Sequence, residues 1–413
     1  MSMKAYKTIL AGASVLALSV SAHAAELEVT HWWTSGGEAA AVQQFATEFE
    51  GQTDHTWVDG AIAGGGGTAR PVMVSRIIGG DPMGAFQFNH GRQAEELIEA
   101  GLLRDMTHVA EAEGWKDIVN PPSLLDACTV DGKIYCAPVN IHSWQWLWLS
   151  NAAFEKAGVD VPANWDEFVA AAPALKEAGI QPMALGGQPW QSSGAFNVLM
   201  ATLAGPEILE KIYGDGDSEL AAGDEMARVF EAAEDMRDMV QGSNVQDWNQ
   251  ATNLVITDAA GGQIMGDWAQ GEFAVAGEVA GTDYTCLPGL GVIEVLSTGG
   301  DAFYFPETND PDVAEAQDAL AATLLKPQTQ VAFNLKKGSL PIRGDVDLAA
   351  ANDCMKKGLE LLAAGKTMPD VNMLNTEDTN NQLNDLFVQF FQDTSITAEA
   401  AQERFVSIVE NKD

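Results

Sequence analysis

Residues 30–38 combine two adjacent aromatic rings with a carboxylate. The segment reads Thr-His-Trp-Trp-Thr-Ser-Gly-Gly-Glu, so that two adjacent indoles, Trp32 and Trp33, precede the carboxylate of Glu38. A flat apolar ring can lie on the CH-rich face of a pyranose, while a carboxylate accepts hydrogen bonds from hydroxyls. The competing interpretation places one of the two rings in the core. Because neighbours on a strand point to opposite faces, we expect at least one ring to face a ligand.

The flanking residues indicate how this segment is positioned. Residues 27–30 alternate in polarity, which predicts a strand, and residues 39–49 have the apolar spacing of a helix. The aromatic pair therefore lies at a strand-to-helix turn, where ligands bind in open α/β sheets. A second short strand, residues 85–88, ends at Asn89 and His90, which predicts a related position for these two side chains.

A glycine run at residues 64–67 precedes a predicted helix over residues 69–78. Such a turn can bind phosphate, but a phosphate-binding loop of this type needs a Gly-Lys-Ser/Thr ending, and Thr68 follows Gly67 directly. We therefore interpret the glycines as a place of close backbone approach at the wall of a cleft.

Three further tryptophans, Trp144, Trp146 and Trp148, alternate along a predicted strand. Their spacing puts all three on one face. We interpret this stripe as core or hinge packing, with a ligand platform as the alternative.

The N-terminus has the pattern of a secretory signal peptide, residues 1–24. Lys4 and Lys7 form a basic start, residues 9–20 are apolar or small, and Ala22-His23-Ala24 fits a cleavage site. We expect an exported chain that begins at Ala25 and has no later apolar run of membrane-spanning length.

Charge argues against several classes of partner. The chain has 59 acidic and 22 basic residues and a formal net charge of −37. Such a chain repels nucleic acid and anionic membranes. The acidic residues are spread along the sequence, which is typical of a solvated surface suited to salt and says little about a ligand.

Four cysteines fit an oxidising compartment. Residues 128–136 predict a hairpin that turns at Asp131-Gly132, so its ends, Cys128 and Cys136, are expected to pair. That leaves Cys286 to pair with Cys354. A metal site is the alternative, but no histidine lies near these cysteines in sequence.

The order of motifs along the chain resembles one protein family. The chain is similar to the extracellular solute-binding proteins of bacterial sugar ABC transporters, and within them to the glucose/mannose-binding branch. The motifs that carry this resemblance are His31-Trp-Trp-Thr-Ser-Gly-Gly-Glu38, Val58-Asp-Gly-Ala-Ile-Ala-Gly-Gly-Gly-Gly67, Val139-Asn-Ile-His142, Gly186-Gly-Gln-Pro-Trp-Gln191, Gln246-Asp-Trp-Asn249, Gln263-Ile-Met-Gly-Asp-Trp268, Cys286 and Lys337-Gly-Ser-Leu-Pro-Ile-Arg343.

The resemblance implies an α/β fold, the two-lobed periplasmic-binding-protein fold with a ligand cleft between the lobes. Lobe one is then residues 25–139 plus 298–337, and lobe two is residues 140–297 plus 338–413. It also implies a sugar site at positions that match the family motifs, namely Trp32, Trp33, Glu38, Trp268, Asp301 and Lys337.

The chain departs from the branch pattern at two positions. Where the branch has a lysine after the strand near residue 88, this chain has Asn89 and His90. Where the branch has a sugar-binding histidine near the C-terminus, no histidine follows His142, and Asn372 or Asn375 is the expected substitute. Two changed hydroxyl partners affect which sugar is selected, because hydrogen-bonding sites discriminate between hydroxyl patterns.

The implied function is that of a periplasmic receptor. It would capture a glucose- or mannose-like monosaccharide and deliver it to the permease subunits of an ABC importer, without cofactor or metal. A chemoreceptor is a further compatible partner. The alternatives are a disaccharide or glucoside ligand in the same system, and an exported glycosidase that uses two carboxylates among Glu38, Asp267 and Asp301.

Overall fold

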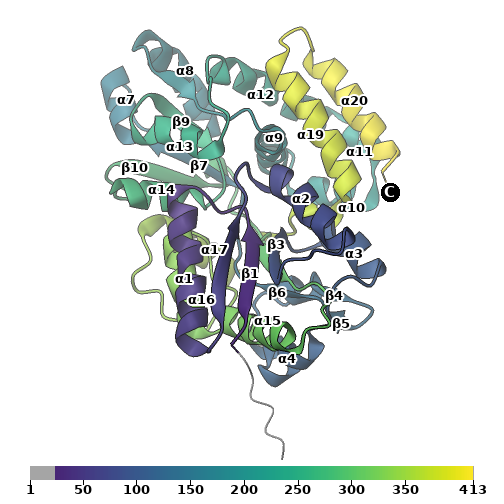
Figure 1. The fold of residues 1–413 in the computed structure, drawn as a ribbon. Coiled ribbons are helices and arrows are strands. Elements are labelled where there is room, and N and C mark those ends of the chain that lie inside the picture. Colours follow the sequence, from purple (N-terminus) through teal and green to yellow (C-terminus); the bar gives the residue numbers. More distant parts are fainter. Residues whose placement is uncertain (1–23, 413) are drawn as a thin grey trace, which may run out of the picture.

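The computed structural model describes residues 24–412, so the predicted signal peptide lies outside the described residues except for Ala24. The chain forms two α/β lobes, one in the lower and one in the upper half of Figure 1. Across residues 24–412, no helix combines the length and apolar character needed to cross a membrane. The two-lobed α/β fold is as predicted. The residue boundaries of the lobes stay a prediction.

Lobe one is built on a five-stranded sheet in the order β2-β1-β3-β12-β6. β1 pairs in parallel with β2 and β3, whereas β12 runs antiparallel to β3 and β6. The strands are β1 (Glu26–His31), β2 (Thr56–Ala61), β3 (Ala85–Asn89), β6 (Cys136–Pro138) and β12 (Asp301–Tyr304). The other elements are α1 (Gly36–Gln52), α2 (Gly66–Ile78), η1 (Arg92–Ala94), α3 (Glu95–Glu99), α4 (Thr107–Ala112), α5 (Trp115–Ile118), α6 (Ser123–Asp126), β4 (Thr129–Val130), β5 (Lys133–Ile134), α15 (Pro311–Leu324) and α16 (Pro327–Lys337).

Lobe two surrounds a four-stranded sheet in the order β10-β7-β9-β8. Its strands are β7 (Trp146–Ser150), β8 (Gln181–Met183), β9 (Ala260–Ile264) and β10 (Tyr284–Pro288), with a small parallel pair, β11 (Leu296–Ser297) and β13 (Thr367–Met368). The helices are α7 (Asn151–Ala157), α8 (Trp165–Glu177), α9 (Pro189–Leu203), α10 (Pro206–Asp215), α11 (Ser218–Ala221), α12 (Asp224–Val240), α13 (Trp248–Ile256), α14 (Ala269–Ala276), η2 (Gly289–Gly291), α17 (Asp353–Ala363), α18 (Val371–Leu374), α19 (Glu377–Gln392) and α20 (Ala398–Glu410).

Helix α1 shows how local sequence positions the N-terminal part of the site. The hydroxyl of Ser35 accepts the backbone N–H of Glu38 and so caps a helix that begins three residues before the predicted start. The apolar face of α1 packs on α16, where the Phe45 and Phe333 rings stack at 4.0 Å. This packing holds the first turn of α1 directly after β1.

Three segments lie at the predicted boundaries of the lobes, residues 139–143, 297–301 and 338–341, and we call them the crossing segments. They are joined by backbone hydrogen bonds. Ile141 and Leu340 exchange two such bonds, of 2.7 and 2.9 Å, and the N–H of His142 donates to Gly299 at 3.1 Å. The crossing segments therefore form one hydrogen-bonded connection between the lobes.

Three segments are less regular than one continuous strand or helix. Residues 133–138 do not form a single strand, because residues 133–134 pair with β4 whereas residues 136–138 pair with β12. Residues 92–99 form the 3-10 turn η1 followed by the short α3. The predicted stripe of tryptophans is shorter than expected, since Trp144 precedes β7, which begins at Trp146.

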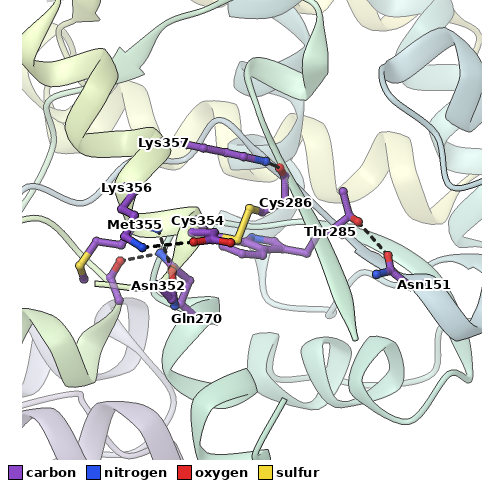
Figure 2. Close-up of a disulfide and its surroundings, with 12 residues drawn as sticks. Asn151, Gln270, Thr285, Cys286, Asn352, Cys354, Met355, Lys356 and Lys357 are labelled. Carbon is purple, nitrogen blue, oxygen red and sulfur yellow. Dashed lines mark hydrogen bonds and ion pairs between the residues drawn. A yellow bond between two sulfur atoms is a disulfide. The ribbon is translucent and has the colours of Figure 1, made fainter. Parts of the chain in front are cut away.

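Both predicted disulfides are confirmed. Cys128 and Cys136 close the β4–β5 hairpin, whose turn residues Asp131 and Gly132 have positive φ angles. Cys286 on β10 is bonded to Cys354 on α17 (Figure 2). Beside this bond, the ammonium of Lys357 donates to the carbonyl of Cys286 at 2.8 Å. The second disulfide thus fastens the C-terminal part of the chain to the lobe-two sheet.

The two disulfides should differ in their contribution to stability. Their cysteines are 68 and 8 residues apart, and loop entropy predicts about 4 kcal/mol for the longer loop and about 2.5 kcal/mol for the shorter one. We expect the double variant Cys286→Ser/Cys354→Ser to lose more unfolding free energy in urea than Cys128→Ser/Cys136→Ser. A larger loss from the hairpin pair would contradict the loop-entropy explanation, and non-reducing peptide mapping checks the pairing itself.

Candidate functional site

Asp301 is the first residue of β12 and the last residue of the crossing segment 297–301, and its carboxylate is buried. One oxygen accepts from Gln87 at 2.7 Å, and the other accepts from Asn140 at 3.0 Å and lies 3.3 Å from Nδ1 of His142. Burial acts to raise the pKa of Asp301, but the charge and hydrogen bond of His142, aided by Lys337 and Asn140, lower it to about 2. Asp301 is therefore ionised at neutral pH.

Glu38 and Lys337 form a buried ion pair next to two indoles. Glu38 stands in the first turn of α1 and Lys337 is the last residue of α16, and Oε1 of Glu38 lies 3.0 Å from the lysine Nζ. The same Nζ lies 5.8 Å from the ring centre of Trp33 and 5.7 Å from that of Trp268. The ammonium of this ion pair thus lies over a lobe-one ring and a lobe-two ring.

The two adjacent tryptophans have different surroundings. Trp33 is 1% exposed and packs against Phe303 and Phe333 in the lobe-one core. Trp32 is partly exposed, and its indole edge lies beside Gly66 of the glycine run. Trp33 is therefore the ring of the pair that lies in the core. Contact of either ring with a sugar stays a prediction.

Trp268 immediately precedes α14 and belongs to an aromatic group of lobe two. Its ring lies 5.0 Å from that of Trp144 and 5.1 Å from that of His142, centre to centre. Trp190 is next, at 6.4 Å. Trp144 therefore packs beside Trp268, whereas Trp146 and Trp148 stack on each other within the core.

His90 is placed close to Asp301, whereas Asn375 is not. Nε2 of His90 lies against Gly300, the residue before Asp301, and neither ring nitrogen of this buried side chain has a hydrogen-bond partner. Burial, with the charge of His142, lowers the pKa of His90 to about 3, so the ring is neutral.

The side-chain amide of Asn375 is used within lobe two. It donates to Asn380 at 3.3 Å, and its oxygen accepts from Lys412 at 3.4 Å. Asn372 instead approaches lobe one, because its side-chain oxygen accepts from Gln93 at 3.5 Å. Of the two predicted substitutes for the branch histidine, Asn372 is the one with a contact across the lobes.

Sequence reasoning did not select His142 and Asp267 as ligand-binding residues. His142 bridges Asp301 and Trp268, and the only signal was its place at the end of the Val139-Asn-Ile-His142 motif. Asp267 was considered only as half of a glycosidase pair. It is 1% exposed, and one of its oxygens accepts from the N–H of Ser143 at 3.0 Å.

The described residues offer no metal centre. Within residues 24–412, no group of three or more His, Cys, Asp or Glu side chains is arranged so that it could hold a metal ion. The buried charges are compensated by one another instead.

Comparison with known proteins identifies the relatives of this chain. Residues 33–329 match the family model described as bacterial extracellular solute-binding protein. A probable sugar-binding periplasmic protein of Rhizobium meliloti (strain 1021) is 38% identical over 368 residues, which are 88% of each chain. A protein of the same description from Brucella melitensis biotype 1 is 38% identical over 81% of this chain and 78% of its own.

A solved structure supports the same fold. A chitin oligosaccharide binding protein superposes with a TM-score of 0.77 at 20% identity, over 94% of this chain and 99% of that one. At this level of identity the likeness concerns the fold alone.

Asp301 should make stability depend on pH. A carboxylate whose folded pKa is lowered stabilises the fold above its unfolded pKa, near 4, and loses this contribution as pH falls through the folded value of about 2. We expect Asp301→Asn to lower the unfolding free energy at pH 7 by about 2 kcal/mol. The difference from wild type should shrink below pH 4 in urea titrations.

The exposed Asp345, which pairs with Arg343 at 2.7 Å, provides the control. Asp345→Asn should cause a smaller and salt-sensitive loss. An equal loss for Asp301→Asn at pH 3 and pH 7 would mean that packing, and not the charge, is responsible.

Proposed function

This chain belongs to the family of bacterial extracellular solute-binding proteins, and we propose that it is the periplasmic sugar receptor of an ABC importer. In this proposal it captures a glucose- or mannose-like monosaccharide between its lobes and delivers it to the permease subunits in the membrane. The names of its curated relatives, probable sugar-binding periplasmic proteins, support the class of ligand.

The observation that carries the proposal is the Glu38–Lys337 ion pair, whose ammonium lies over the rings of both Trp33 and Trp268. A pyranose needs an apolar surface for its CH-rich face and charged groups for its hydroxyls. Indole rings supply the first, and ionised donors and acceptors supply the second, at about 1.5–3 kcal/mol for each hydrogen bond.

Each residue has a proposed role. Trp268, with Trp33 opposite, contacts the faces of the sugar, and Trp32 borders the site near the glycine run. Glu38 and Lys337 bind hydroxyls, and the prediction from the sequence adds Asp301 as a third group of this kind. His90 replaces the lysine of the glucose/mannose branch. Asn375 or Asn372 replaces the branch histidine, and the contact across the lobes favours Asn372.

Delivery to the permease requires that the protein distinguish its bound from its free form. The crossing segments are the place where the lobes can rotate, and a ligand that contacts both lobes shifts the population toward the closed state. A chemoreceptor that recognises the closed form would be a second partner compatible with this mechanism.

A disaccharide or glucoside is the alternative ligand. The observation that favours it is Trp190, which lies beyond Trp268, is partly exposed and has an indole N–H without a partner. The glycosidase hypothesis has no comparable support, because the relatives are named as binding proteins.

A thermal-shift screen tests the proposal. At 100 times its dissociation constant a sugar should stabilise the protein by about 2.7 kcal/mol. We expect D-glucose or D-mannose to raise the melting temperature most. A shift with disaccharides alone would favour the alternative ligand, and no shift with any sugar would refute the proposed function. Release of aryl alcohol from aryl glycosides would indicate an enzyme.

Trp268→Ala should weaken sugar binding more than folding. The loss of an aromatic contact and of buried apolar area predicts about 2–4 kcal/mol, on the order of 30- to 1,000-fold in dissociation constant. Trp165→Ala is a matched control, since Trp165 is also buried in lobe two but packs on Phe168. Calorimetric titration and melting of both variants should show weak binding for the first and low stability for the second. Near-normal affinity of Trp268→Ala would remove Trp268 from the site.

A further inference from the structure

The carboxylate of Asp301 has no acceptor capacity left. An ionised carboxylate offers about four lone-pair sites. In addition to the contacts with Gln87, Asn140 and His142, the amide of Asn89 donates to it at 3.4 Å. A sugar hydroxyl could bind Asp301 only by displacing one of these partners. Its surroundings suit a fixed structural charge better than a ligand acceptor.

Asp267 is in the opposite situation. Its Oδ2 atom accepts from the N–H and the hydroxyl of Ser143, at 3.0 and 3.3 Å. Its Oδ1 atom is buried and has no partner. A buried acceptor without a hydrogen bond is unfavourable, so native structures rarely leave one without a purpose. This free oxygen is an acceptor that a ligand could satisfy.

Asp267 borders the proposed sugar site, where the charges of His142 and Lys337 act on it. Asp267 immediately precedes Trp268, whose ring lies 5.7 Å from the Lys337 ammonium and 5.1 Å from the His142 ring. On the lobe-one side, His90 has two unpaired ring nitrogens against Gly300. Each lobe thus contributes one buried polar side chain with unused hydrogen-bonding capacity.

We propose that Asp267 is a specificity-determining residue whose Oδ1 atom accepts a hydrogen bond from one pyranose hydroxyl, whereas Asp301 fixes the crossing segments. This inference rests on the proposed function, because it names the contact that the sugar makes. It also assigns the ligand class more closely. The ligand has a hydroxyl that reaches Oδ1 of Asp267 while one face of its ring lies on Trp268.

The electrostatic surroundings of Asp267 agree with this role. Burial raises the pKa of Asp267 to about 7, although the charges of His142 and Lys337 and the hydrogen bonds from Ser143 act to lower it. In either protonation state Oδ1 lacks a partner within the protein. A hydroxyl that donates to it would favour the ionised form.

The substitution Asp267→Asn tests the inference with almost no change in shape. The asparagine oxygen can still accept from Ser143, but the free acceptor becomes an NH2 donor. The probes are D-glucose and its 2-, 3-, 4- and 6-deoxy analogues in calorimetric titrations. We expect wild type to bind one deoxy analogue at least tenfold more weakly than D-glucose, and the variant to bind D-glucose about ten- to a hundredfold more weakly. Asp267→Asn should bind that one analogue and D-glucose with similar affinity, because the variant lacks the acceptor for the hydroxyl that the analogue lacks.

The control substitution is Asp258→Asn. Asp258 lies in the same lobe as Asp267, but it precedes β9, whereas Asp267 follows that strand. Asp258 accepts from Ser150 and has a positive φ angle, which asparagine tolerates. This variant should keep the wild-type affinity and the wild-type pattern of deoxy-sugar losses. Melting temperatures of both variants separate a change in folding from a change in binding.

The outcomes are distinguishable. The inference is wrong, and the proposed function stands, if wild type binds D-glucose and Asp267→Asn binds it with the same affinity. The same conclusion follows if Asp267→Asn loses affinity for every deoxy analogue to the extent that wild type does. If wild type binds no sugar, both are wrong. If Asp267→Asn does not fold, a crystal structure of wild type with D-glucose decides, since a sugar oxygen within hydrogen-bond distance of Oδ1 supports the inference and its absence there refutes it.

Discussion

The burial of one carboxylate, that of Asp301, constrains how the two lobes are joined. Its backbone N–H and one oxygen bond the side chain of Asn140, and Asn140 in turn donates to Ser339 at 3.2 Å. These three residues come from the three crossing segments, and Gln87 connects them to β3. Removal of one partner from a buried charge costs far more than loss of a surface ion pair. The connection between the lobes is therefore built around a charge that must stay paired.

A second constraint is the close approach of the two lobes beside Glu38. The N–H of Gly37 at the start of α1 donates to Glu272 of α14 at 2.7 Å. A side chain at Gly37 would collide with the backbone of Gly271, because its Cβ would lie 2.5 Å from the carbonyl carbon. Glycine at this position lets the first turn of α1 touch lobe two. The same turn carries Glu38, so lobe contact and the placement of a proposed sugar-binding group depend on each other.

Local sequence patterns predicted the features that local physics decides. The turn at Asp131-Gly132 predicted the hairpin and, with it, the disulfide between Cys128 and Cys136. The alternation of side chains along a strand correctly predicted different surroundings for Trp32 and Trp33, but it could not say which of the two rings is in the core. That depends on Phe303 and Phe333, which are distant in sequence. The free oxygen of Asp267 was unpredictable for the same reason, because its partner Ser143 is 124 residues away.

The balance of buried charges at the proposed site indicates whether the sugar is neutral or charged. Three carboxylates, those of Glu38, Asp267 and Asp301, accompany the ammonium of Lys337 and the imidazole of His142. Burial acts to lower the pKa of His142, but the charge and hydrogen bond of Asp301, with the charges of other carboxylates, raise it overall. With both bases charged, the positive charges do not exceed the negative ones. A sugar phosphate or sugar acid would add a further buried anion without a free cation to pair with it, which is costly. A neutral sugar adds hydroxyls that donate to the carboxylates and leaves the charge unchanged, so the electrostatics favour a neutral ligand.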